Sequence, residues 1–261
     1  MAFFECNFFS ETLGIAVSVN VVLPQQTFTQ IGMQNVSSGK ECPVLYLLHG
    51  LSDDHTIWMR RTSIERYAAT YGIAVVMPCG GRSYYTDMAH GGKYWTYISE
   101  ELPARMKEFF KISSKREDTF AAGLSMGGYG ALKLALRCPD RFAAAASLSG
   151  ALDPLFLLKF MPKNEPEFCN IFGDLSKFHG SENDLWAECN RRKEENAAIP
   201  ELFLSCGTED ALYQDTVRFR EHLDSFGIPH VGKDYPGSHS WEYWDTLIKE
   251  VLAWLPIRKK S

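Results

Sequence analysis

Short apolar runs recur along the chain, and they limit its fold more than any other feature of the sequence. The clearest of them cover residues 44–48, 73–77, 119–123, 143–148 and 202–206. Strands that are apolar on both faces are typical of a parallel sheet with helices packed on each side. Segments with helical spacing lie between the runs. The sequence therefore predicts an α/β fold with a mostly parallel central sheet and helices on both faces.

The remaining elements are predicted from local signals. Further strands are expected over residues 15–23, with 3–9 as partner, and over 231–235. Helices are expected over residues 98–110, 126–137 and 212–226. A last helix carries one apolar face and ends at Pro256.

One segment interrupts this alternation. Residues 151–200 are polar and contain Pro154, Pro162 and Pro166. About 15 residues would suffice for a crossover helix, so the excess indicates either a lid over a site or surface elaboration. We predict a single domain over residues 1–261 with an irregular, cap-like insertion at about 151–200.

Composition excludes several function classes. The 27 basic residues face 32 acidic ones without a basic stripe, which argues against nucleic-acid binding. The seven cysteines include no C-x-x-C pair, so we expect reduced thiols and no metal site. No apolar run approaches the roughly 20 residues of a membrane span. The first 15 residues lack the basic-then-apolar order of a signal peptide, so a cytoplasmic location is expected.

The strongest local motif is Gly123-Leu124-Ser125-Met126-Gly127. It matches G-x-S-x-G between an apolar strand and a helix, which is the context that a nucleophilic serine needs. The sharp turn exposes the Ser125 hydroxyl and requires small residues two positions before and after it. The following helix start favours a developing negative charge, and the Met126 N–H is expected to be one oxyanion donor.

A serine hydroxyl needs a base, and His239 is the best placed of the seven histidines. It lies in a loop after a predicted strand and before the last helix, at the edge of the sheet where sites form. The alternatives are weaker, because His222 falls inside a predicted helix and His230 at a strand start. We therefore predict His239 as the general base.

The base needs an orienting carboxylate on the preceding loop, and Gly207-Thr208-Glu209-Asp210 follows a predicted strand. Asp210 is favoured and Glu209 is its competitor. The order Ser125, Asp210, His239 is that of the α/β-hydrolases.

A second oxyanion donor is expected from the loop that follows residues 44–48. Gly50 permits a turn that directs the Leu51 N–H inward, and His49 is interpreted as a structural brace for this loop.

Four motifs together resemble a known superfamily. They are H-G-L-S at 49–52, G-L-S-M-G-G-Y-G-A at 123–131, G-T-E-D at 207–210 and G-S-H-S-W at 237–241. They resemble the esterase D and S-formylglutathione hydrolase superfamily, and the chain is most similar to bacterial tributyrin esterases. These are relatives of carbohydrate esterase family 1, which includes acetyl xylan and feruloyl esterases.

The resemblance implies an α/β-hydrolase fold, no cofactor and a serine carboxylesterase of short acyl esters. Small-molecule or oligosaccharide esters, acetylated or feruloylated, are the implied substrates. Ser125, Asp210 and His239 would be nucleophile, acid and base, with Leu51 and Met126 as the oxyanion hole. S-formylglutathione hydrolysis stays open as an alternative, although residues 79–87 are closer to the tributyrin type. Acyl transfer, an inactive binding protein and a homo-oligomer also stay open.

Aromatic side chains surround the expected cleft. Trp58, Tyr84, Tyr85 and Trp95 lie in or beside loops that follow predicted strands. Their faces could hold an aryl acyl group or a sugar ring. The alternative for each is ordinary packing in the core or at the rim.

Overall fold

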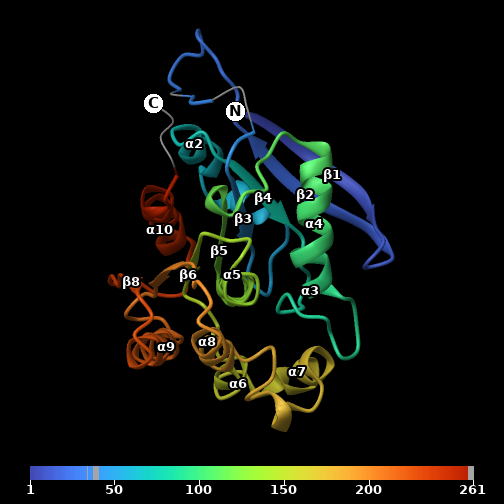
Figure 1. Ribbon diagram of the computed structural model, residues 1–261, viewed down its shortest axis with the longest axis vertical. Coiled ribbons are helices and arrows are strands. Elements are labelled where there is room, and N and C mark those ends of the chain that lie inside the picture. Colours follow the sequence, from blue (N-terminus) through green and yellow to red (C-terminus); the bar gives the residue numbers. More distant parts are fainter. Residues whose placement is uncertain (34, 38–40, 258–261) are drawn as a thin grey trace.

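An eight-stranded sheet forms the centre of the computed structural model, which describes residues 1–33, 35–37 and 41–257 (Figure 1). The strand order is β1 (Ala2–Ser10), β2 (Ile15–Leu23), β4 (Ala74–Pro78), β3 (Val44–Leu48), β5 (Thr119–Leu124), β6 (Ala144–Leu148), β7 (Glu201–Ser205) and β8 (His230–Gly232). The strands β1 and β2 are antiparallel to their neighbours, and β3 to β8 are parallel. The mostly parallel sheet expected from the apolar runs is confirmed.

Helices cover both faces of the sheet, as the apolar strands require. Alternate side chains of β3 enter opposite cores: Tyr46 and Leu48 pack on one side, Leu45 and Leu47 on the other. The first core includes residues of α4 (Leu102–Phe109), α5 (Met126–Arg137) and α9 (Tyr213–Ser225). The second includes residues of α1 (Ile57–Arg61), α2 (Ile64–Ala69) and α10 (Trp241–Trp254). None of the helices in the described residues is long and apolar enough to span a membrane.

Most differences from the predicted elements lie at their ends. The segment predicted as one helix from residue 98 begins earlier, as α3 (Tyr94–Thr96), and passes through a π-helical turn (Tyr97–Glu101) into α4. The strand expected over residues 231–235 ends at Gly232. Beyond it the Asp234 carboxylate accepts the Cys206 N–H at 3.3 Å and binds Arg220. This side chain takes the place of a strand hydrogen bond and interrupts the ladder, which resumes only as an isolated bridge between Gly207 and Tyr235.

The insertion between β6 and β7 is largely helical, so the expectation of an irregular segment is wrong. It contains α6 (Pro154–Leu157), α7 (Glu165–Phe172) and α8 (Leu185–Glu194), in the lower part of Figure 1. Asp153 and Asp184 cap α6 and α8 by accepting backbone N–H groups of the first turn. These caps, with Pro154 and Pro166 near helix starts, are the signals that could have predicted the helices.

Candidate active site

Ser125 occupies a sharp turn between β5 and α5. Its backbone has φ 53° and ψ −119°, which is strained for a residue with a side chain. The turn depends on its glycines. A Cβ atom on Gly123 would lie 2.3 Å from the Gly127 carbonyl oxygen, and one on Gly127 would lie 2.3 Å from the Leu48 carbonyl oxygen. Only glycine fits either position, which explains the spacing of the motif.

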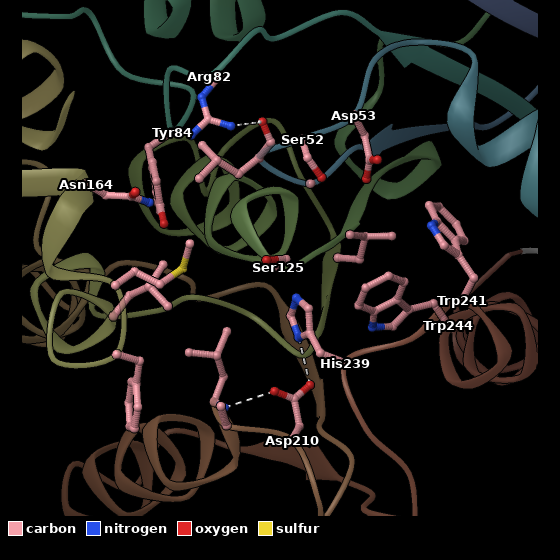
Figure 2. A pocket seen from close by; sticks show the side chains of 18 residues that line it. Ser52, Asp53, Arg82, Tyr84, Ser125, Asn164, Asp210, His239, Trp241 and Trp244 are labelled. Carbon is pink, nitrogen blue, oxygen red and sulfur yellow. Dashed lines mark hydrogen bonds and ion pairs between the residues drawn. The ribbon is translucent and has the colours of Figure 1, made fainter.

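His239 and Asp210 form a hydrogen-bonded pair beside this turn. The His239 Nδ1 and Asp210 Oδ2 atoms are 2.8 Å apart, across two loops that follow β7 and β8 (Figure 2). The Asp210 side chain is fully buried, whereas that of His239 is 37% exposed. Glu209, the competing carboxylate, is exposed, so Asp210 is the acid that contacts the histidine.

The environment keeps Asp210 ionised. Burial acts to raise the pKa of its carboxyl, but the hydrogen bonds and the charge of His239 and the N–H of Leu212 outweigh burial. The pKa therefore lies below its ordinary value. The Leu212 N–H donates to Asp210 Oδ1 at 2.9 Å, which also fixes the orientation of the carboxylate. An ionised acid of fixed orientation can hold His239 in the tautomer whose Nε2 accepts a proton.

The three side chains share one pocket of about 600 Å³. Figure 2 shows the imidazole of His239 directed toward Ser125, with Asp210 behind it. In the described part of the chain the Ser125 hydroxyl makes no hydrogen bond, so it is available to a ligand. Catalytic hydrogen bonds are often long without substrate and shorten when substrate binds.

The loop after β3 is braced by His49, as the sequence predicted. This buried histidine contacts the Gly50 carbonyl through Nδ1 at 2.7 Å and accepts the Gly80 N–H at Nε2 at 2.8 Å. Burial lowers the pKa of His49, so it stays neutral and suits one donor and one acceptor. Leu51 lines the pocket, and Met126 is the first residue of α5, where the N–H has no acceptor within the helix.

The four aromatic candidates are placed differently. Tyr84 lines the pocket and is otherwise buried against α7. Trp58 is buried and donates to the Leu48 carbonyl, and buried Tyr85 donates to the His49 carbonyl. Trp95 stacks on the Arg137 guanidinium at 4.4 Å. None of these last three is among the residues that line the pocket.

Several lining residues were missed by the sequence analysis. Those from the insertion are Leu157, Phe160, Met161 and Asn164, and those from other loops and α10 are Ser52, Asp53, Arg82, Trp241 and Trp244. The exposed apolar pair Phe160 and Met161 lies in a segment that reads as polar and Pro-containing. Trp241 directly follows the histidine loop, and that adjacency was the available signal. The described residues contain no cluster of side chains suited to hold a metal ion.

A buried lysine holds the loop that carries Tyr84. Lys133 on α5 donates to Thr86 Oγ1 at 2.8 Å, to Asn183 Oδ1 at 2.7 Å and to the Tyr85 carbonyl at 3.3 Å. It thereby connects α5, this loop and the insertion. Both Tyr84 and Tyr85 have positive φ, so the loop needs such external support. Burial, with the charge of Arg137, lowers the pKa of Lys133 to about 7.

This shift predicts a pH-dependent stability. Between about pH 7 and 9 the unfolded chain keeps Lys133 protonated while the folded chain releases the proton, so the free energy of unfolding rises with pH. Lys133→Met should remove this contribution. We expect the free energy of unfolding of the wild type, relative to that of the variant, to rise by on the order of 1 kcal/mol per pH unit in this range. Urea denaturation at several pH values measures it. The exposed Lys177→Met serves as control, and a difference that does not change with pH would contradict the lowered pKa.

Known esterases are similar to this chain in sequence and in structure. A family model described as "Putative esterase" matches residues 10–255. The chain belongs to this esterase family. An acetyl esterase of Caldicellulosiruptor saccharolyticus is 30% identical over 98% of both chains. The substrate-bound fluorophosphonate-binding serine hydrolase F of Staphylococcus aureus is 39% identical, with a TM-score of 0.89 over 98% of both chains. The S-formylglutathione hydrolase of that organism is 38% identical, with a TM-score of 0.84 over 98% of both chains.

These relatives confirm the expected superfamily and the α/β-hydrolase fold. They also confirm that the chain is an enzyme of the serine esterase type.

Proposed function

We propose that this esterase hydrolyses short-chain acyl esters, from acetyl to butyryl, through an acyl-enzyme on Ser125. The observation that carries the proposal is the hydrogen bond between His239 and buried Asp210, beside a strained serine in the same pocket. This arrangement supplies a nucleophile, a base and an orienting acid. Acetylated or feruloylated carbohydrates are included among the proposed substrates. The cytoplasmic location stays a prediction.

The proposed reaction runs in two halves. His239 takes the proton of Ser125 as the hydroxyl attacks the ester carbonyl, and the amides of Leu51 and Met126 receive the oxyanion. Asp210 stabilises the imidazolium that forms. His239 then gives the proton to the leaving alcohol, and water releases the acid by the same steps.

The acyl preference is tested with p-nitrophenyl esters of different length. The acetyl esterase relative supports short acyl groups, and Leu157, Phe160 and Met161 offer an apolar wall for them. We expect kcat/KM to fall beyond about four to six acyl carbons, as the chain outgrows the pocket. Acetyl, butyryl, octanoyl and feruloyl esters should be compared on the purified protein. Preferential turnover of the octanoyl ester would refute the short-chain proposal.

A thioesterase activity is the second candidate function. It is favoured by one observation, the 38% identity to an S-formylglutathione hydrolase over nearly the whole chain. The same nucleophile and oxyanion donors would serve either bond. Rates on S-formylglutathione and on acetylated sugars, measured with one enzyme preparation, discriminate between the two candidates.

A further inference from the structure

Asp53 is a partly buried carboxylate in the wall of the pocket. Its backbone N–H donates to the Gly50 carbonyl at 3.2 Å, which fixes the turn after β3. A Cβ atom on Gly50 would lie 3.1 Å from Asp53 Oδ2 and 3.7 Å from the Cβ of Ser125. The carboxylate and the serine therefore flank the same glycine. The adjacent Asp54 is different, because its Oδ1 accepts from the N–H and the hydroxyl of Thr56.

Among the charged side chains that line the pocket, Asp53 is the one without an ion-pair partner in the described residues. Arg82 is paired with Glu167 through contacts of 2.5 and 2.7 Å, and Asp210 is paired with His239. The Asp53 side chain makes no ion pair within the described part of the chain; the Gly50 backbone hydrogen-bonds to its carboxyl, and the charge of Arg61 acts on it only as a smaller influence. Burial raises its pKa, as expected of a carboxylate removed from water. Such a group favours a cation beside it.

Two indoles line the pocket on the side of Asp53 (Figure 2). The Trp244 ring meets the His239 ring edge-on, with centroids 4.8 Å apart, and the Trp241 ring lies 5.2 Å from Trp244. The leaving oxygen must approach His239, because the imidazole protonates it. A leaving group therefore extends along Trp244 and Trp241. Asn164 of the insertion lies on the opposite side of Ser125 from the two indoles in Figure 2. The apolar wall that the insertion contributes to the pocket remains for the acyl group.

We propose that Asp53, Trp241 and Trp244 form a leaving-group subsite that accepts alcohols carrying an ammonium group. A carboxylate supplies charge complementarity, and indole rings attract cations through their electron-rich faces. The same charge disfavours anionic leaving groups, including glutathione, which carries two carboxylates and one ammonium group. The inference rests on the proposed function and names the substrate class of that site.

The test compares three acetate esters that differ in charge. Acetylcholine is cationic, 3,3-dimethylbutyl acetate is its neutral isostere, and 4-acetoxybutyrate is anionic. For the wild type we expect kcat/KM for acetylcholine to exceed that for the neutral isostere about tenfold, and the anionic ester to be the poorest. Asp53→Asn should reduce the cationic preference to less than about twofold, because the amide keeps the shape without the charge. High salt should weaken the wild-type preference.

Glu209→Gln is the matched control, because it removes a nearby exposed charge that does not line the pocket. It should retain the preference, and Trp241→Leu should lower it a few-fold. Thermal unfolding verifies that each variant is folded. Equal rates on the cationic and neutral esters, or a preference unchanged in Asp53→Asn, would overturn the subsite. Failure to hydrolyse p-nitrophenyl acetate, which carries no cation, would instead contradict the proposed function, so the two failures are distinguishable.

Discussion

Ser125→Ala is expected to lower kcat/KM for p-nitrophenyl acetate by at least about 10⁴-fold. Without the hydroxyl no acyl-enzyme forms, and the oxyanion donors alone give only residual catalysis. The fold should survive, because the Ser125 side chain makes no hydrogen bond in the described residues and alanine occupies the same backbone conformation. The measurements are initial rates, far-ultraviolet circular dichroism and thermal unfolding.

Covalent labelling by a fluorophosphonate probe separates loss of the nucleophile from loss of the fold. Wild-type protein should become labelled and Ser125→Ala should not. Ser225→Ala replaces an exposed serine at the end of α9 and should behave as wild type in both assays. A folded Ser125→Ala protein that retains near-wild-type turnover would assign the chemistry to another residue.

The sequence predicted those features that depend on local physics. Continuous apolar runs identify strands buried on both faces, and β3 was predicted to the residue. The spacing of Gly123, Ser125 and Gly127 reflects contacts within one turn, so it was readable without the fold. The pairing of Asp210 with His239 followed from one topological rule, that loops after parallel strands meet at one edge of the sheet.

The lining of the pocket could not be predicted in this way, because it depends on the direction of side chains across long loops. Trp58 and Trp241 pack against each other, with ring centroids 5.2 Å apart. Trp58 is 1% exposed in the core, whereas Trp241 reaches the pocket. The sequence alone does not tell which of the two tryptophans is buried in the core and which lines the pocket. The helices of the insertion left local signals in their caps, but α7 and α8 also depend on contacts of Phe168, Ile171 and Leu185 with the core, which the sequence does not show.

Asp210→Asn tests the orienting acid, and its effect should be second only to that of Ser125→Ala. The asparagine side chain can still accept the Leu212 N–H, which the Asp210 carboxylate receives at 2.9 Å, so the loop should keep its conformation. Its neutral amide no longer stabilises the imidazolium, and it permits the wrong tautomer of His239. By analogy with other serine hydrolases we expect kcat to fall by about 10³- to 10⁴-fold, with KM little changed.

The matched control is Glu209→Gln, which removes a charge one residue away without contact to His239 and should leave kcat within about twofold of wild type. The two variants should be compared at several pH values, with unfolding measured in parallel. If Asp210→Asn and Glu209→Gln had the same kcat, the 2.8 Å contact between His239 and Asp210 would be structural only, and the base would need another partner. A large loss confined to Asp210→Asn, in a folded protein, assigns the carboxylate to the transition state, because His239 takes the serine proton there and the carboxylate stabilises the resulting imidazolium.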